Sequence, residues 1–187
     1  MTISAVILAG GKSLRMGRDK AWLEYKRQPL LCHQTETVLR LDPAEMFIAG
    51  GSNPQFARLG WPILIDNFPG QGPLAGIEKA LAVMRSPLLL VLAVDMPHMT
   101  AAVLRRLAGH CSDRTGVVPR LGDRVEPLAA FYPKAAHRPL RTSLGEGLNS
   151  AVGFAQLCVT LGLAEYYDVP PSHEHRFANW NTPADVA

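Results

Sequence analysis

Cysteine is scarce in this chain, and its placement excludes several classes of protein. The three cysteines, Cys32, Cys111 and Cys158, lie far apart, are odd in number and form no CxxC pair. A disulfide framework needs an even set of cysteines, and a structural zinc site needs closely spaced pairs of ligands. We therefore expect reduced thiols and a cytoplasmic location.

Long apolar runs and a strong excess of one charge are also missing. No run approaches the roughly 20 residues needed to cross a membrane, and no basic segment precedes the short apolar stretch 5–9, as it would in a signal peptide. The 19 basic and 16 acidic residues leave a net charge of +3, with the basic residues scattered. This pattern argues against membrane and nucleic-acid partners and is compatible with anionic small molecules. Because 48% of the residues are hydrophobic, a sizeable core can form.

Apolar segments typical of strands alternate with segments typical of helices through the first two thirds of the chain. The expected strands are 3–9, 22–25, 46–49, 63–65, 88–94, 116–119, 128–132 and 166–169. The expected helices are 30–41, 72–85, 101–110 with Thr100 as N-cap, most of 134–163 and a last one from Pro183, and 170–175 reads as a loop. This alternation predicts an α/β fold of three layers, α/β/α, with a Rossmann-like, mostly parallel sheet.

Three expected strands are followed directly by residues suited to a binding site. Gly10 and Gly11 follow the first strand, Asp66 follows the strand 63–65, and Asp95 follows the strand 88–94. Ligands of open parallel sheets bind outside the carboxyl ends of the strands. We therefore expect a site at this edge, although Asp95 could also simply start a turn before Met-Pro.

Residues 8–20, LAGGKSLRMGRDK, look suited to phosphate but fit neither common phosphate loop. A P-loop places a glycine five residues before the glycine of GKS, and Val6 occupies that position. A dinucleotide loop needs G-x-G-x-x-G, which these glycines do not provide. What remains is a Gly-Gly turn that lets the backbone approach a nucleotide, followed by Arg15 and Lys20, which can bind phosphate. A tight turn with solvated basic residues is the alternative.

This stretch resembles the signature LAGGxSxRMGxDK of the molybdenum cofactor guanylyltransferase (MobA) family, in the nucleotidyltransferase superfamily. Further motifs follow in order over nearly the whole chain: GPLAGI (72–77), DMP (95–97), EPLAAFY (126–132) and NWNTPAD (179–185). The first and last motifs together are specific, whereas each middle one alone is weak. The resemblance implies a fold like that of nucleotide-diphospho-sugar transferases, as one domain over 1–187. Its nucleotide-binding half would reach to about residue 100, and its pterin-binding half would span about 101–187.

The resemblance implies transfer of GMP from GTP to the terminal phosphate of molybdopterin, or of Mo-molybdopterin, with release of pyrophosphate. Mg²⁺ would be the cofactor, and molybdoenzyme apoproteins or chaperones would be further partners. The residues implied to bind the nucleotide are Leu8, Ala9, Gly10, Gly11, Lys20, Asp66 and Asp95. Asp95 would also bind Mg²⁺, and Asn179 and Asn181 would lie near the second substrate or the metal, although both can also cap turns before a last helix.

Two details of the motifs bear on the nucleotide. The adjacent glycines Gly10 and Gly11 resemble the guanine-selective form of the motif, since the related cytidylyltransferases carry LAAG there. The family often has a nucleotide-binding asparagine just after the second core strand, where this chain reads IAGGSN. Gly50 is the nearest match, and Asn53 lies three residues late, which puts a role for Asn53 in doubt.

The chemistry implied by the family needs charge neutralisation rather than a general base. The attacking phosphate monoester is already anionic at neutral pH, and two anions must be brought into line. We expect Arg15, Lys20 and Asp95 to be the catalytic residues, with Mg²⁺ on Asp95. Arg124 is a candidate for the pterin phosphate, although an ordinary surface pair of Arg124 with Glu126 fits equally well.

Other functions remain open from the sequence alone. A cytidylyltransferase for the same pterin, or a nucleotidyltransferase for another phosphorylated small molecule, would have the same fold. A non-catalytic nucleotide-binding module would keep the loop but has little need of a metal-binding carboxylate at Asp95.

Overall fold

A single eight-stranded sheet runs through the chain in the computed structural model, which describes residues 1–10, 19–50, 54–68, 70–147 and 150–180. Its strands are β1 (Ile3–Leu8), β4 (Glu45–Ala49), β5 (Ile63–Leu64), β6 (Leu88–Ala93), β7 (Gly116–Leu121), β8 (Arg124–Val125), β9 (Ala129–Pro133) and β10 (Ala164–Asp168). Their order is β10-β7-β9-β6-β1-β4-β5, with β8 paired to β7. Strands β1, β4, β5 and β6 are mutually parallel, as are β7 and β10, whereas β9 is antiparallel to both of its neighbours.

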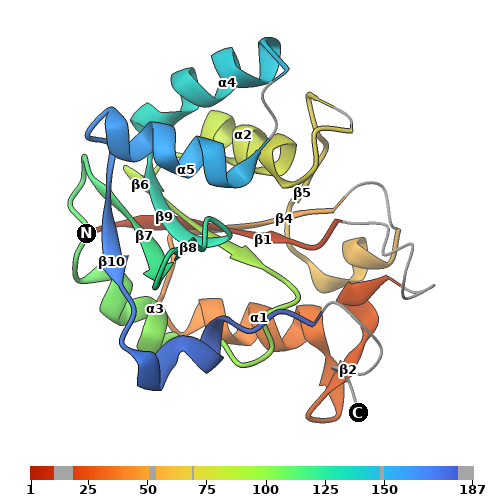
Figure 1. Ribbon diagram of the computed structural model, residues 1–187. Coiled ribbons are helices and arrows are strands. Elements are labelled where there is room, and N and C mark those ends of the chain that lie inside the picture. Colours follow the sequence, from red (N-terminus) through yellow and green to blue (C-terminus); the bar gives the residue numbers. More distant parts are fainter. Residues whose placement is uncertain (11–18, 51–53, 69, 148–149, 181–187) are drawn as a thin grey trace.

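Helices cover both faces of this sheet (Figure 1). On one face lie α2 (Pro73–Val83), α4 (His137–Gly145) and α5 (Ala151–Thr160), and on the other lie α1 (Leu30–Leu39) and α3 (Ala101–Ala108). Short 3₁₀ helices η1 (Lys20–Trp22), η2 (Pro54–Leu59), η3 (Lys134–Ala136) and η4 (Pro171–Phe177) and a small hairpin of β2 (Glu24–Tyr25) and β3 (Gln28–Pro29) complete the described elements. The expected three-layer α/β fold with a mostly parallel sheet is confirmed.

Strand β6 forms the centre of the protein. All six of its residues are buried, and the first five alternate between two apolar cores: Leu88, Leu90 and Leu92 face α1 and α3, while Leu89 and Val91 face α2, α4 and α5. Such double burial explains why the segment reads as a continuous apolar run rather than an alternating one. Thr100 caps α3 as expected, because its side chain accepts a hydrogen bond from Val103 N.

Local structure differs from the expectation in three places. Residues 170–175, expected as a loop, lie largely in η4, since two prolines fix the backbone where a 3₁₀ turn can begin. Only Glu24–Tyr25 of the expected strand 22–25 forms a strand, and Trp22 ends η1. The two-residue strand β8 is too short to leave a periodic pattern in the sequence.

No helix among the described residues is long and apolar enough to cross a membrane.

Candidate active site

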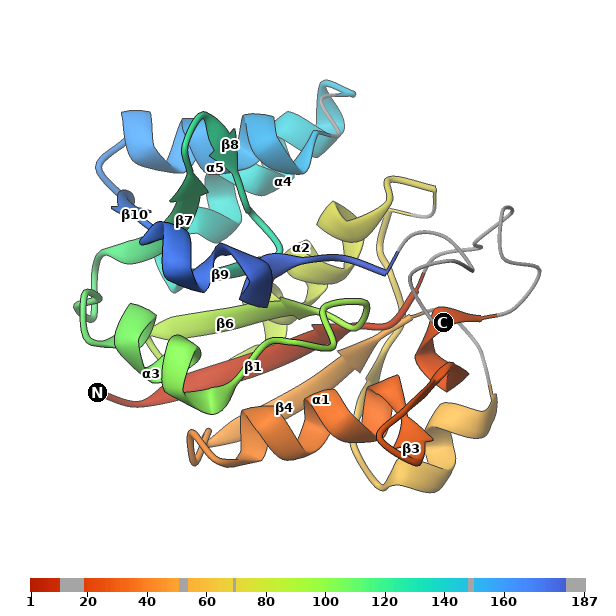
Figure 2. The same cartoon turned by 60° about the horizontal axis from the view of Figure 1, so that its bottom comes forward.

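The expected site residues that the structure describes lie at the edge where the parallel strands end. Figure 2 shows the arrowheads of β1, β4 and β6 pointing to the same side of the molecule. Leu8, Ala9 and Gly10 are the end of β1 and the two residues after it, Asp66 is two residues beyond β5, and Asp95 is two beyond β6. Because β9 runs the other way, the residues that precede it reach this edge as well.

The backbones that follow β1 and β4 touch each other at two glycines. A Cβ atom built on Gly10 would lie 2.9 Å from Gly50 Cα, and one built on Gly50 would lie 3.0 Å from Gly10 N and 2.7 Å from Phe56 Cε2. Neither position has room for a side chain without a shift. An asparagine at position 50 would therefore not fit this arrangement, which explains the departure from the family pattern there. Gly11 and Asn53 lie outside the described residues.

Lys20 and Asp95 form an ion pair at the centre of this edge. Lys20 Nζ lies 2.8 Å from Asp95 Oδ2, and their side chains are only 18% and 20% exposed. Asp19 caps η1 by accepting a hydrogen bond from Ala21 N, which fixes the start of the short helix that carries Lys20. Trp180 N donates to Asp95 O over 2.8 Å, so the C-terminal segment is attached to the same turn. Three segments that are distant in sequence thus meet at one point.

Two side-chain oxygens of expected site residues are buried without a hydrogen-bond partner among the described residues. They are Asp66 Oδ1 and Asn179 Oδ1. Burial raises the pKa of Asp66, and its Oδ1 lies 4.0 Å from where a Cβ on Gly76 of α2 would be. Asn179 precedes Trp180 and therefore lies beside the Asp95 turn. Carboxylate and carbonyl oxygens are the ligands that Mg²⁺ prefers, so Asp95 with the spare oxygen of Asn179 fits that cation. Arg15 and Asn181 lie outside the described residues.

On the other side of Asp95 lies an acidic residue that the sequence reading treated only as a neighbour of Arg124. Arg124 Nη1 and Glu126 Oε2 are 3.7 Å apart, but the two side chains differ sharply: that of Arg124 is 54% exposed and that of Glu126 only 7%. Burial raises the pKa of Glu126, and nearby Asp95 raises it further, while Leu128 N and Arg124 oppose the rise. The pair is therefore not an ordinary surface ion pair.

A second buried carboxylate supports the segment that follows Asp66. Glu78 of α2 is 2% exposed; His137 Nε2 of α4 lies 2.8 Å from its Oε1, and Asn67 Nδ2 donates to its Oε2 over 3.0 Å. Sequence reading missed this network because its residues come from three separate elements. One feature of the sequence could have indicated the network: Glu78 lies on the apolar face of the predicted helix 72–85, and a glutamate is rarely buried without partners.

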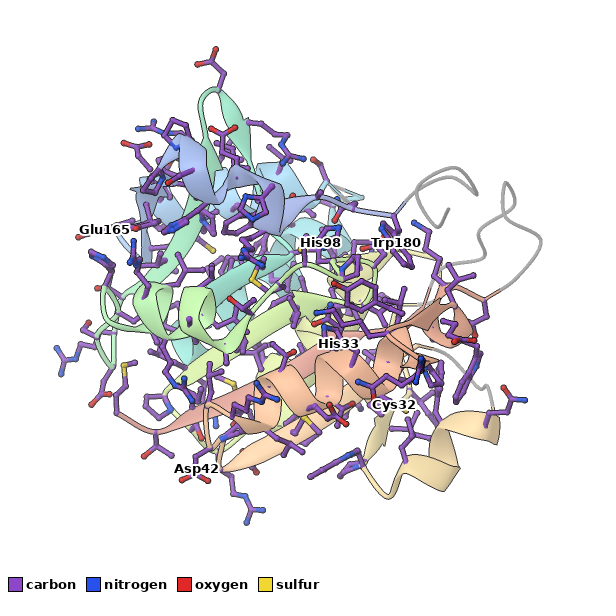
Figure 3. All side chains as sticks on the ribbon, turned by 90° about the horizontal axis from the view of Figure 1, so that it is seen from below. Cys32, His33, Asp42, His98, Glu165 and Trp180 are labelled. Atoms are coloured by element: carbon purple, nitrogen blue, oxygen red, sulfur yellow. The ribbon has the colours of Figure 1, made fainter. Side chains whose placement is uncertain are left out.

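An aromatic cluster lies against the Asp95 turn on the α1 side. The ring of Tyr25 packs edge-on against those of His33, His98 and Trp180, with centroid distances of 4.8, 5.8 and 5.5 Å. His33 Nε2 lies 3.2 Å from Pro97 O. Figure 3 labels three of these residues, which come from α1, the turn after Asp95 and the C-terminal segment. The cluster thus ties together the segments that carry Lys20, Asp95 and Asn179.

Comparison with known proteins decides the family. Residues 5–158 match the family model described as "MobA-like NTP transferase domain". This chain belongs to the MobA-like NTP transferase family. Among curated MobA-like relatives, a probable molybdenum cofactor guanylyltransferase of Opitutus terrae is 34% identical, with 98% of this chain and 92% of that protein covered. A molybdenum cofactor guanylyltransferase of Syntrophotalea carbinolica is also 34% identical, with 97% and 88% covered.

Solved structures share the MobA-like fold. The molybdopterin-guanine dinucleotide biosynthesis protein A from Archaeoglobus fulgidus superimposes with a TM-score of 0.76 at 24% identity, covering 98% of this chain and 94% of that one. A 2-C-methyl-D-erythritol 4-phosphate cytidylyltransferase from Thermus thermophilus gives a TM-score of 0.71 at 20% identity, covering 97% and 94%. At these identities the likeness establishes the fold. It does not identify the base of the nucleotide or the acceptor, which must be argued from the site.

Proposed function

We propose that this protein transfers GMP from GTP to the terminal phosphate of molybdopterin, or of Mo-molybdopterin, in a reaction that requires Mg²⁺ and releases pyrophosphate. The proposal places the enzyme in the cytoplasm, in keeping with its three unpaired cysteines. The observation that carries it is the Lys20–Asp95 pair at the carboxyl ends of the parallel strands, in a chain that shares its family with guanylyltransferases over nearly its full length.

The site provides what phosphoryl transfer between two anions needs. Lys20 can leave Asp95 and place its ammonium group on the nucleotide phosphates, which frees the Asp95 carboxylate. Asp95, with Asn179 beside it, would hold Mg²⁺, which when bound neutralises charge on the phosphates. No general base is required, because a phosphate monoester carries about −1.5 to −2 charges at pH 7.

In this proposal the nucleoside lies against the backbone that follows β1. Gly10 has no side chain to cover this backbone, and its tight contact with Gly50 fixes the backbone in place for a base or ribose to approach. Asp66 lies farther along the same edge with an unpaired oxygen, in a position to accept a hydrogen bond from the nucleoside.

The test is a pyrophosphate-release assay with molybdopterin and each of the four nucleoside triphosphates. We expect release with GTP in the presence of Mg²⁺ and its loss in Asp95→Asn, a change that keeps the shape of the side chain and removes its charge. Asp168→Asn is the matched control and should retain full activity, since Asp168 of β10 forms an exposed ion pair with Arg120 of β7. Release of pyrophosphate with CTP but not GTP would overturn the guanine assignment. Equal release with and without Mg²⁺ would overturn the proposed requirement for the metal.

A further inference from the structure

Glu126 is a buried carboxylate at the candidate active site, and the reaction described above gives it no role. It is 5% exposed, and within the described part of the chain its two oxygens have only long contacts, 3.4 Å from Leu128 N and 3.7 Å from Arg124 Nη1. A carboxylate can accept about four hydrogen bonds, and a buried one that lacks them is costly. Such a group is expected where a ligand supplies the missing donors.

The backbone around Glu126 is held on both sides, so the carboxylate has a fixed position. Glu126 N donates to Pro119 O of β7 over 2.9 Å, and Leu128 O accepts from Ala93 N of β6 over 2.8 Å. Between them, Pro127 restricts the backbone, and the buried hydroxyl of Tyr132 donates to Pro127 O over 3.0 Å. A preorganised acceptor of this kind loses little entropy when a ligand binds to it.

The position of Glu126 places it beside Asp95 but away from the nucleotide. Strand β6 lies between β9 and β1 in the sheet, and Leu92 pairs with Ala129. Continued past the ends of the two strands, this register sets Asp95 opposite Glu126. Apart from Lys20 and Asp95 itself, the described residues expected to bind GTP lie on the other side of β6, at the end of β1 and after β5. An in-line transfer needs the acceptor on the side of the α-phosphate opposite the leaving pyrophosphate, and Glu126 lies on the side of β6 opposite β1, β4 and β5.

The charge of Glu126 selects the part of the acceptor that can lie against it. A carboxylate repels a phosphate dianion, whereas it pairs well with N–H groups. The exposed guanidinium of Arg124 is the nearby group suited to phosphate. A pterin ring presents an amino group next to a ring N–H, two parallel donors that match the two oxygens of a carboxylate.

We propose that Glu126 binds the N–H groups of the acceptor's pterin ring and so contributes to recognition of the second substrate. The inference rests on the proposed function, since it takes the acceptor to be a pterin. It assigns Glu126 to binding of the acceptor and gives it no part in binding GTP or the metal.

Steady-state kinetics of Glu126→Gln test the proposal. The variant keeps the shape of the side chain but places an NH₂ group against the ring donors. Removing hydrogen bonds to a charged group predicts a KM for molybdopterin about 10- to 100-fold higher, with KM for GTP within about twofold of the unaltered protein. Glu126→Asp, which retains the charge on a shorter side chain, should recover part of the affinity. Glu165→Gln on β10, an exposed site far across the view from Trp180 in Figure 3, is the matched control.

Two ligand measurements separate this role from the alternatives. A phosphate-free pterin should compete with molybdopterin in the unaltered protein and lose that effect in Glu126→Gln, while inorganic phosphate should inhibit both equally. Weaker Mn²⁺ binding by Glu126→Gln in the absence of acceptor would overturn the proposal in favour of a metal ligand. An unchanged KM for molybdopterin would also overturn it. If the unaltered protein fails to turn over molybdopterin with GTP, the proposed function fails first and the pterin assignment fails with it. Circular dichroism and melting temperature show whether each variant is folded, and if Glu126→Gln does not fold, Glu126→Asp carries the KM and competition tests.

Discussion

Replacing Lys20 by methionine should change the binding of metal and of nucleotide in opposite directions. Lys20 Nζ lies 2.8 Å from Asp95 Oδ2, so a divalent cation that uses this oxygen must displace the ammonium group. A nucleotide, in contrast, needs that ammonium group on its phosphates. The substitution Lys20→Met keeps most of the apolar stem of the lysine and removes only the charge.

The size of the effect follows from the environment of the pair. Two unit charges 4 Å apart attract by about 4 kcal/mol at an effective dielectric constant of about 20. Desolvation and side-chain ordering reduce the net value for a partly exposed pair to about 1–2 kcal/mol. Because 1.4 kcal/mol corresponds to a factor of ten, Lys20→Met should bind Mn²⁺ alone roughly 5- to 30-fold more tightly. GTP should bind about tenfold or more weakly, since a charge-assisted contact to phosphate is lost.

Electron paramagnetic resonance of free Mn²⁺ measures the first quantity without nucleotide, and equilibrium dialysis of GTP measures the second. Lys26→Met, an equal change of charge at an exposed residue of the β2–β3 hairpin, should alter neither by more than about twofold. Weaker or unchanged Mn²⁺ binding in Lys20→Met would refute the reasoning, because it would mean that the ion pair does not compete with a cation for Asp95.

Three further predictions concern stability. Gly76→Ala should lower the free energy of unfolding in urea by about 1–3 kcal/mol, because its Cβ would lie 2.8 Å from Ala49 Cβ; unaltered stability would mean that α2 shifts freely. Burial raises the pKa of Glu45, but hydrogen bonds from Arg85 and Ser4 and the charge of Arg85 outweigh it and lower the pKa from 4.5 to about 2. Glu45→Gln should therefore be less stable than the unaltered protein above about pH 4.5, and chemical denaturation should show this difference vanishing as the pH falls to about 2; a difference that persists at pH 2 would assign it to packing. Thr100→Ala should cost about 1 kcal/mol in a thermal or urea titration through loss of the helix cap, and a cost near zero would mean that water replaces the cap.

The sequence predicts those site residues that directly follow a parallel strand. Parallel strands end at the same edge, so glycine or aspartate placed directly after an apolar strand locates the site without knowledge of strand order. This rule selects Asp66 and Asp95, and both lie at that edge. The motif around 8–20 adds Lys20 at the same place, and its pairing with Asp95 agrees with that reading.

The residues that sequence reading undervalued depend on contacts between distant segments. His137 binds Glu78 from 59 positions away in sequence, and no local pattern shows that their helices α2 and α4 are neighbours. Glu126 looks like part of a surface pair because Arg124 and Asp123 surround it with charge in the sequence. Its burial arises from the antiparallel insertion of β9 between β6 and β7, and the sequence pattern predicts β9 as a strand but not its direction.

The arrangement of charges around Asp95 explains how Asp95 and Glu126 can lie near each other at this edge. Lys20 lies against Asp95, and Arg124 lies 3.7 Å from Glu126, so each carboxylate has its own cation. A carboxylate left without such a partner in a buried site would destabilise the fold by several kcal/mol. The two pairs differ in strength, however, because one is short and shielded while the other is long and half exposed to water. The nucleotide and its metal must therefore replace the strong ion pair between Lys20 and Asp95. An acceptor meets Glu126, whose ion pair is weak. This difference predicts that GTP and the metal bind cooperatively, because GTP draws Lys20 away from Asp95 and the metal draws Asp95 away from Lys20. It also predicts that Glu126 binds the acceptor's ring without first breaking a strong ion pair.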